Sequence, residues 1–343
     1  MKTLIFSGSY YQIGQQLGRL YQANGKSFSR VAVNEKLFKR QLGIYQKYYP
    51  AFIAELKGVA QGGGFDEKKT LYQFLAGSLV WTLTNKIHPR FSECSIFGVN
   101  NKSGLLIGRN YDWDPITAEI FKVYKVKPQN KYAYLAVSDM WVNGPADRDP
   151  KNHYYLPIDA INDQGLYIGL TAARNYNWSY GLPSVHLIKL IVENCRNVNE
   201  AINIFKKVPL NCAKNFLIGD KAGNMVAIEH LSGTKFKIVY PQDDLLIQTN
   251  HFVHPDLIKE DKVKKTSTSF LRYYEIFRAI NQRGIDKFKQ EDIIKILGAR
   301  DSYVLQDLPG LKTIWSLSLN LKHADYRLYY NLFGKRKSLK LKI

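Results

Sequence analysis

The pattern of the chain changes at Cys94, and this change limits the folds open to it. Before Cys94, apolar residues recur at helical spacing; after it, short apolar or alternating runs typical of strands dominate. Many of these runs are joined by two to six residues rich in Gly, Asn, Asp and Lys, as at 220–224. Links this short favour antiparallel hairpins. The expected strands are 95–99, 105–109, 132–137, 166–170, 216–218, 225–229, 236–240, 245–248, 314–321 and 326–332.

Three helices are expected before Cys94 and two helical blocks after it. Gly14 and Gly18 lie four residues apart beside the first apolar stripe, which allows close packing against a neighbour. Asp66 is a plausible N-cap for the third helix. Of the two helical blocks after Cys94, the second is shorter than the first. The expected helical stretches are 13–21, 52–60 ended by Gly62–Gly64, 71–79, 184–207 broken near Asn197, and 267–283.

Strands with segregated helices predict an α+β fold in which two antiparallel sheets pack together with helices outside. We expect residues 1–93 to form a helical segment and 94–343 to form the main domain. Hydrophobic residues make up 45% and charged residues 23% of the 343, which excludes a disordered or fibrous chain. No apolar run is long enough for a membrane span or a signal peptide, so a cytoplasmic location is expected.

The chain is strongly basic, with 49 Lys and Arg against 29 Asp and Glu. This excess raises the question of polyanion binding, but no nucleic-acid-binding motif accompanies it. The basic run 335–342 alternates at its end and is suited to a strand edge, where Lys discourages aggregation. The three cysteines exclude a disulfide scaffold.

The densest group of reactive residues lies between Cys94 and Trp113. The run reads as strand, tight turn and strand, so a hairpin would bring Arg109 and Asp112 back beside Cys94. A nearby cation favours the thiolate form of a cysteine, and a carboxylate can orient an amine or an arginine. The residues alone leave open a plainer interpretation, a buried structural cysteine beside a surface ion pair.

Other candidate sites are weaker. Cys195 shares an apolar helical stripe and is expected to be a core thiol, and Cys212 lies in a loop. A papain-type dyad with His153, His230 or His251 remains an alternative, but a papain-type cysteine starts a helix and Cys94 starts a strand. The histidines show no metal-ligand spacing. Trp113, Trp141, Tyr176 and Trp178 would suit either an aromatic acyl pocket or core filling.

Several blocks, in order along nearly the whole chain, resemble the N-terminal-nucleophile linear amide hydrolases. This family includes choloylglycine (bile salt) hydrolase, penicillin V acylase and the penicillin acyltransferase-like peptidases. The long segment before Cys94 favours the acyltransferase-like branch. The matching blocks are Gly8–Gly18, Glu55–Gly64, Cys94–Trp113, Ile161–Leu170, Gln248–His251 and Thr313–Leu317.

The resemblance implies a four-layer αββα sandwich and a mechanism for Cys94. The thiol would attack the Glu93 carbonyl, and the resulting self-cleavage would leave Cys94 at a new N-terminus. Its free α-amine would then act as base for its own thiol. The resemblance assigns Asn250 to the oxyanion hole. It assigns Arg109 and Asp112 to a pair that holds the thiol and the amine.

Two further positions depart from the family pattern. Bile salt hydrolases carry an Asn where this chain has Thr171 and Ala172. A family Arg aligns with either Ser269 or Arg272, so both alignments stay open. Thr171 and Arg272 complete the set of candidate catalytic residues.

The resemblance therefore implies an amide C–N hydrolase, self-processed at Glu93–Cys94, that cleaves a linear small-molecule acyl amide through a thioester. An acyltransferase using the same thioester is one alternative, and a non-catalytic basic surface-binding protein on the same scaffold is another. We expect no cofactor, no metal, no specific nucleic-acid partner and no transmembrane segment. The acyl group, the amine, a homo-oligomer and retention of residues 1–93 after cleavage are left open.

Overall fold

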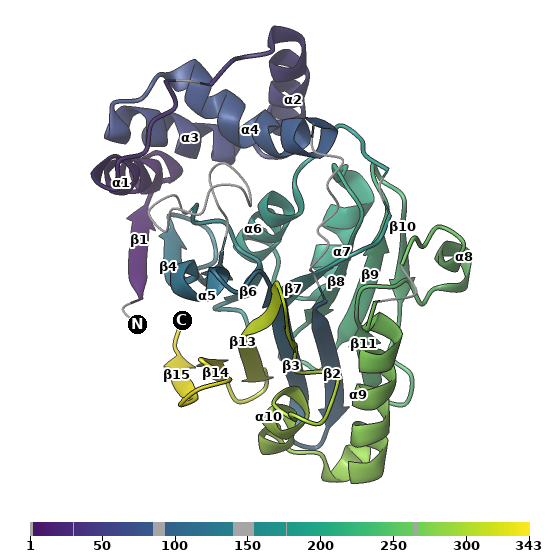
Figure 1. Ribbon diagram of the computed structural model, residues 1–343. Helices are drawn as coiled ribbons and strands as arrows, with labels where there is room; N and C mark the ends of the chain where they lie inside the picture. Colours follow the sequence, from purple (N-terminus) through teal and green to yellow (C-terminus); the bar gives the residue numbers. More distant parts are fainter. Residues whose placement is uncertain (1–2, 30, 85–92, 140–153, 176, 264–266) are drawn as a thin grey trace.

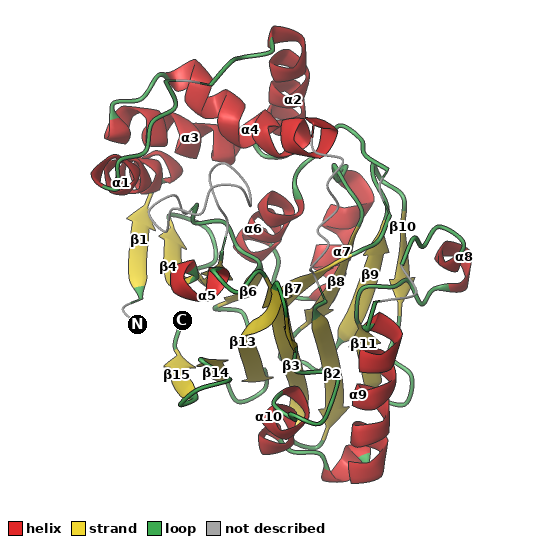
Figure 2. Ribbon diagram, in the orientation of Figure 1, coloured by secondary structure: helices red, strands yellow, loops and turns green. Residues whose placement is uncertain are grey.

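The chain folds into two β-sheets packed face to face with helices on both outer sides (Figure 1; Figure 2). A computed structural model describes residues 3–29, 31–84, 93–139, 154–175, 177–263 and 267–343. Strands of one sheet contact those of the other at β2 with β7 and β8, and at β11 with β8 and β9. The predicted four-layer αββα arrangement is confirmed.

The first sheet has eight strands within the described residues, in the order β1-β4-β5-β6-β7-β8-β9-β10. Neighbours pair antiparallel except β1 and β4, which are parallel. The strands are β1 Leu4–Gly8, β4 Lys122–Pro128, β5 Tyr134–Ser138, β6 Asp159–Asn162, β7 Tyr167–Ala172, β8 Lys214–Gly219, β9 Met225–His230 and β10 Phe236–Val239.

The second sheet has the order β11-β2-β3-β13-β14-β15, and β12 pairs with β13 beside this path. The basic C-terminal run forms β15, an edge strand whose lysines are largely exposed, as a lysine-rich edge favours. The strands are β2 Ser95–Asn101, β3 Gly104–Trp113, β11 Leu245–Gln248, β12 Asp307–Leu308, β13 Leu311–Asn320, β14 Asp325–Tyr330 and β15 Lys337–Leu341.

Helices cover both sheets. α6 packs on β6 and β7 of the first sheet, while α9 and α10 pack on β2, β3, β11 and β13 of the second. The N-terminal helices α1 to α4 form a separate group at the top of Figure 1. The helices are α1 Tyr10–Ala23, α2 Glu35–Tyr48, α3 Pro50–Gly63, α4 Glu67–Thr84, α5 Thr117–Ile120, α6 Ser184–Asn194, α7 Val198–Lys207, α8 Pro255–Ile258, α9 Ser269–Arg283, the 3₁₀ turn η1 Ile285–Lys287 and α10 Gln290–Leu297.

The segment before Cys94 is mostly helical, as predicted, but it also supplies a strand. β1 pairs in parallel with β4, more than a hundred residues further along the chain. The segment before Cys94 is therefore not purely helical and the sheets are not purely antiparallel, which corrects the prediction from the sequence. The sequence pattern does indicate an edge strand in the basic run that forms β15. It does not indicate α2, α5, α8, α10, β4, β6 or β12. The predicted break near Asn197 is confirmed, because Asn197 caps α7 through the Glu200 amide.

Glycines bring α1 and α3 unusually close. A Cβ atom built on Gly14 would lie 1.9 Å from the Glu55 carbonyl oxygen, and one on Gly58 would lie 2.1 Å from the Tyr11 carbonyl oxygen. Real Cβ atoms do not approach backbone this closely, so the contact requires glycine on both helices. The close packing expected from Gly14 and Gly18 is therefore present, with α3 as the neighbour.

We expect Gly14→Ala to destabilise the protein by about 1–3 kcal/mol, because overpacking forces the two helix backbones apart. Chemical denaturation would measure the free energy of unfolding. Gly43→Ala is the matched control, since an added Cβ on this exposed residue of α2 meets nothing within 4 Å. It should instead stabilise the chain by about 0.5–1 kcal/mol. Equal effects at the two positions would contradict this account of the interface.

A buried ionic cluster joins the N-terminal helices to α6. The Lys189 ammonium lies 2.9 Å from the Glu55 carboxylate on α3 and also pairs with Glu193 on its own helix. Tyr10 and Tyr49 donate their hydroxyls to Glu193. Burial raises the pKa of Glu55 to about 7, although the Lys189 charge opposes this shift. Removing one partner from such a buried cluster is costly, so the two parts of the chain are tightly coupled.

Candidate active site

The hairpin of β2 and β3 brings Cys94 beside Asp112, as predicted. The strands pair in register from Ser95 with Asn110 to Asn101 with Gly104. At the open end the Cys94 thiol points to the Asp112 carbonyl, with Sγ and O 3.9 Å apart. Cys94 is 1% exposed. The site therefore lies between the sheets rather than on the surface.

Arg109 lies at this end of the hairpin but forms its ion pair with a residue the sequence did not point to. Its Nε donates to Asp159 on β6 at 3.2 Å, across the space between the sheets. Burial opposes the charge, but Asp159 and a hydrogen bond with Cys94 raise the pKa of Arg109 above its ordinary value. The surface Arg109–Asp112 ion pair of the plainer interpretation is therefore not found, because both side chains are buried and Arg109 pairs with Asp159.

Asp159 collects three donors within the core. Besides Arg109, the Tyr167 hydroxyl donates at 2.9 Å and the Trp315 indole Nε1 at 3.2 Å. The residue is 1% exposed. The sequence feature that could have identified Asp159 is its position as a lone acid within the apolar run 156–161. An acid buried in such a run requires buried partners. Asp159 therefore fixes the position of the Arg109 guanidinium.

Asp112 is fully buried, and one of its two carboxylate oxygens has a hydrogen-bond partner among the described residues. One carboxylate oxygen accepts a hydrogen bond from the Thr313 hydroxyl at 2.7 Å. The other, Oδ2, has no hydrogen-bond partner among the described residues. Burial raises the pKa of Asp112 to about 7, against the lowering influence of Arg272 and Arg109. Asp112 therefore lies beside Cys94 with one side-chain oxygen that has no donor among the described residues.

The Asp112 shift predicts a pH-dependent stability of the uncut chain. The folded pKa of about 7 exceeds the ordinary 3.8, so the folded state binds the extra proton and stability falls as pH rises between these values. Asp112→Asn in a Cys94→Ala background should remove this loss, a gain of up to about 4 kcal/mol at pH 8 relative to pH 4. Denaturant unfolding across this pH range measures it, with Asp301→Asn on the surface as control. Parallel stability curves with and without the substitution would contradict the argument.

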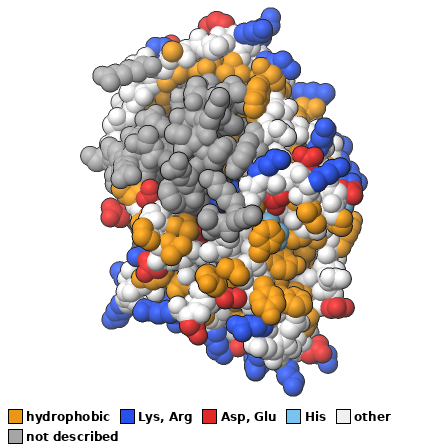
Figure 3. Space-filling model, turned by 45° about the vertical axis from the view of Figure 1, so that its right-hand side comes forward, with side chains coloured by type: hydrophobic (Ala, Val, Ile, Leu, Met, Phe, Trp, Pro, Cys, Tyr) orange, Lys and Arg blue, Asp and Glu red, His pale blue; other side chains and the backbone are white. Residues whose placement is uncertain are grey.

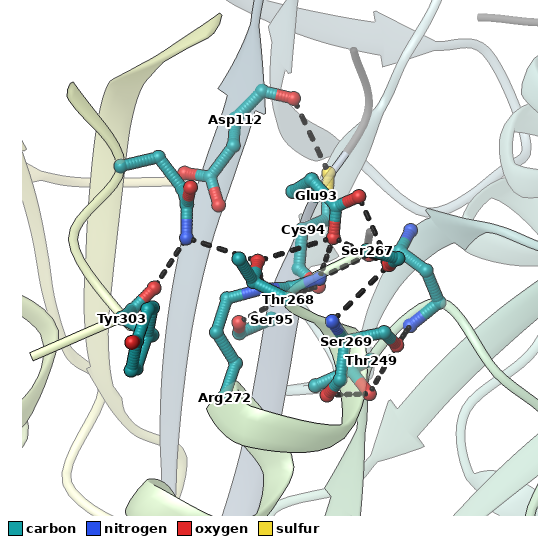
Figure 4. Close-up of polar contacts among 12 residues, drawn as sticks. Glu93, Cys94, Ser95, Asp112, Thr249, Ser267, Thr268, Ser269, Arg272 and Tyr303 are labelled. Atoms are coloured by element: carbon teal, nitrogen blue, oxygen red, sulfur yellow. Dashed lines mark hydrogen bonds and ion pairs between the residues drawn. The ribbon is translucent and has the colours of Figure 1, made fainter. Parts of the chain in front are cut away.

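Glu93, the residue before Cys94, has its side chain in a basic site of its own (Figure 4). Its carboxylate pairs with Arg272 and with Arg174, the latter at 3.2 Å. The hydroxyls of Ser267 and Thr268 donate to it at 3.0 and 3.3 Å. The Glu93 side chain is thus bound by four groups while its carbonyl carbon is joined directly to the Cys94 nitrogen.

Arg272, in the first turn of α9, connects the site. Its Nη1 donates to the Cys94 carbonyl oxygen and, at 2.8 Å, to the Ser95 hydroxyl. Its Nη2 donates to the Asn250 side-chain oxygen at 2.8 Å. Of the two alignments left open by the sequence, the structure places Arg272 against Cys94, while the Ser269 hydroxyl accepts the Asn250 backbone N–H at 2.9 Å.

Asn250 and Thr171 lie on the neighbouring loop and strand end. The Asn250 amide donates one hydrogen to the Ala172 carbonyl at 2.8 Å, and an amide carries a second hydrogen. The Thr171 hydroxyl donates to the Thr249 carbonyl. The structure thus brings Asn250 to Cys94 through Arg272, whereas Thr171 fixes the segment that carries Asn250. Both side chains are fully buried.

An open pocket of about 440 Å³ is lined by the segment that follows Asn250 and by the start of α9. Figure 3 shows hydrophobic side chains gathered on the face that carries α8 and α9. Of the aromatic residues suggested for an acyl pocket, Trp141 and Tyr176 lie outside the described residues. Trp178 is 43% exposed, and Trp113 stacks on Tyr111. The pocket is lined by His251, Phe252, Val253, Ile258, Asp261, Val263, Phe270 and Tyr273.

The competing cysteine and histidine sites have structural explanations. Cys195 is buried at the end of α6, and burial raises its pKa to about 12, as suits a core thiol. Burial lowers the pKa of His230 and of His251 to about 4, so both rings are neutral near pH 7. Cys94 precedes a strand rather than a helix, which disfavours a papain-type dyad. His153 lies outside the described residues.

Two further properties concern the described part of the chain. No group of three His, Cys, Asp or Glu side chains there is arranged to hold a metal ion. Within the same residues, no helix has the length and apolar character needed to cross a membrane.

Among known protein families, one matches more than half of this chain. A family model described as acyl-coenzyme A:6-aminopenicillanic acid acyl-transferase matches residues 99–332, a match that starts within β2, after Cys94. A comparison with curated protein sequences finds no match.

Two solved structures share the fold. A mutant of conjugated bile acid hydrolase from Clostridium perfringens is 13% identical with a TM-score of 0.51, covering 72% of this chain and 92% of that one. Penicillin V acylase from Agrobacterium tumefaciens is 13% identical with a TM-score of 0.50, covering 72% and 86%. At this identity the likeness concerns the fold, and it agrees with the expected sandwich.

Proposed function

Because this chain belongs to the family described as acyl-coenzyme A:6-aminopenicillanic acid acyl-transferase, we propose that it is an amide C–N hydrolase whose nucleophile is an N-terminal Cys94. The observation that carries the proposal is the unpartnered Oδ2 of Asp112 beside Cys94 in the uncut chain, among the residues that the structure describes. Cleavage before Cys94 would create an α-amine at this end of the hairpin. That amine would supply the donor that Asp112 lacks.

The maturation step would start with the Cys94 thiol attacking the Glu93 carbonyl carbon. A C–S bond forms, the C–N bond to Cys94 breaks, and the thiol proton passes to the released α-amine. Water then adds to the thioester, which regenerates the thiol and leaves Glu93 with a free α-carboxyl group. The four groups that bind the Glu93 side chain would hold its carbonyl in place for this attack.

In turnover, the same thiol would attack the carbonyl of an acyl amide. The Cys94 α-amine, with an ordinary pKa of about 7.7–8.0, takes the thiol proton and passes it to the departing amine. Asn250 would donate its second amide hydrogen to the oxyanion. Arg109 would favour the thiolate, and Asp112 would orient the α-amine. Water finally hydrolyses the acyl thioester.

Residues 1–93 would remain bound after cleavage. β1 pairs with β4 along five residues, and the Lys189–Glu55 ion pair is buried between the two parts. Separating them would expose this cluster and the apolar faces of α1 and α3. A processed protein should therefore elute from a sizing column with both chains together.

Acyl transfer is the second candidate function, because the matching family is described as an acyl-transferase. The same thioester would be opened by an amine instead of water. A non-catalytic basic protein on this scaffold is the remaining alternative, motivated by the net charge of +20. A cytoplasmic location remains a prediction from the sequence.

Intact mass and an amide assay test the proposal. Processing should yield fragments of about 11 and 29 kDa, in proportion to 93 and 250 of the 343 residues of the 39.5 kDa chain. Added amines that divert the acyl group from water would identify a transferase. A single uncut chain that binds heparin and cleaves no amide would support the non-catalytic alternative and refute the proposal.

A further inference from the structure

We propose that the site holding the Glu93 carboxylate recognises an acid on the acyl group of the substrate, so that the enzyme prefers amides of dicarboxylic half-acids of glutaryl length. This inference rests on the proposed function of Cys94. It adds a substrate class, which neither the hairpin nor the family match specifies.

The chemical argument starts from the acyl group that Cys94 would carry. During processing, the carbonyl of Glu93 would become the acyl half of the thioester on Sγ. During turnover, the carbonyl of the substrate would take that same place on the same sulfur. The side chain of Glu93 therefore marks where the remainder of a substrate acyl group lies. From its carbonyl carbon to its side-chain carboxylate, a glutamyl residue has the length of a glutaryl chain.

The site that binds this carboxylate is built for an anion. Arg272 is fully buried, and the hydroxyls of Ser267 and Thr268 converge on the same carboxylate from the start of the 15-residue helix α9. Charge-assisted hydrogen bonds of this kind are stronger than neutral ones. The N-terminal end of a helix adds a favourable field for an anion.

Vacating the site would leave Arg272 without a carboxylate. Among the described residues, Glu93 is the one whose carboxylate forms an ion pair with Arg272. Its remaining hydrogen-bond acceptors are neutral oxygens of Cys94, Ser95, Asn250 and Thr268. A buried cation that loses its partner is strongly unfavourable. Since the Glu93 carbonyl must leave Sγ before a substrate binds, a substrate carboxylate would restore the lost interaction.

The nearby acid Asp112 does not take this role. Arg272 lies close enough to lower the pKa of Asp112. Among the described residues, however, the donor to the Asp112 carboxylate is Thr313. The proposed α-amine of Cys94 would donate to the other carboxylate oxygen, Oδ2. The anion site and the amine site are therefore separate. One would bind the acid of the acyl group and the other would prepare the nucleophile.

The first test compares amides of one chromogenic amine. Processed protein is given the glutaryl, succinyl and pentanoyl amides, of which pentanoyl replaces the distal carboxylate with a methyl group. We expect kcat/KM to be about 10²-fold higher for glutaryl than for pentanoyl, because a buried hydrogen-bonding site rejects a ligand that leaves it unpaired. Equal rates, or a preference for pentanoyl, would overturn the inference while leaving the amide hydrolase intact. The inference would also be overturned if the enzyme cleaved acyl-glycine amides, which carry the acid on the amine, but showed no preference for an acid on the acyl group.

The second test removes one of the two arginines that bind the Glu93 carboxylate. Arg174→Gln should reduce the glutaryl-to-pentanoyl ratio of kcat/KM by about tenfold or more, since it deletes one of the two cations. Arg196→Gln is the matched control, because this exposed arginine pairs with Glu200 on α7. The control should leave the ratio unchanged. A ratio that survives in Arg174→Gln contradicts the assignment.

A binding measurement separates failure of this inference from failure of the proposed function. Cys94→Ala keeps Glu93 in the site, whereas Cys94→Ala with Glu93→Ala empties it without any cleavage. Calorimetric titration with glutarate should show binding to the double variant and none to the single one. Absence of binding to the double variant overturns the inference even if amides are cleaved. Binding by the double variant, when wild type neither processes nor cleaves, would support the anion site while refuting the enzyme.

Discussion

Cys94→Ala is expected to remain one chain of 39.5 kDa and to lose amide cleavage. The reason is that the thiol would perform both the attack on Glu93 and the attack on the substrate. Loss of a covalent nucleophile lowers turnover by as much as about 10⁶-fold. Intact mass spectrometry measures processing, and release of the amine measures turnover. Cys94→Ser should process slowly, because a hydroxyl is a weaker nucleophile.

The matched control is Cys195→Ala, which removes a buried thiol at the end of α6. It should process normally and lose stability rather than activity. If Cys94→Ala still yields a fragment that begins at residue 94, an external protease makes the cut. That result would remove self-processing from the proposed function.

Asn250→Ala is expected to lower kcat by about 10²–10³-fold, the usual effect of deleting one oxyanion donor. KM should change less, because the donor is used as negative charge develops on the carbonyl oxygen. The substitution also removes one of the acceptors of Arg272 and the donor to the Ala172 carbonyl. A thermal melt must therefore accompany the kinetics, so that misfolding is not read as lost catalysis.

Asn101→Ala is the matched control for this experiment. Its amide donates to the carbonyls of Ile285 and Phe288 at the closed end of the same hairpin, away from Cys94. Its side-chain oxygen also accepts the Ser103 backbone N–H at 2.9 Å, so the substitution deletes three structural hydrogen bonds. It should lower stability while leaving kcat near the wild-type value. Near-wild-type turnover in Asn250→Ala would exclude Asn250 from the oxyanion hole.

Local patterns in the sequence were sufficient for the parts of the fold made from neighbouring residues. The alternating runs on either side of the turn at 102–103 predicted the β2–β3 hairpin, and with it the contact between Cys94 and Asp112. Gly62–Gly64 predicted the end of α3, and Asn197 predicted the start of α7. These features depend on periodicity and capping, which act over a few residues.

Strands and helices with weak patterns required the tertiary structure. β6 has four residues, and α2 buries only Gln41 and Tyr45 on one side, so neither has a long apolar stripe. β1 is held by parallel pairing with β4 across more than a hundred residues. Such pairing depends on the whole sheet and leaves no mark in the five residues of the strand itself.

The same distinction applies to the candidate site. The residues themselves determined a thiol, an arginine and a carboxylate on one hairpin, and the resemblance named Asn250 and left Ser269 and Arg272 open. Only the packing of the two sheets placed Asp159 against Arg109 and brought Arg272 to both Glu93 and Cys94. These contacts join residues 50 to 179 positions apart. They form because buried charges must find partners wherever the folded core brings them together, and no local spacing encodes that choice.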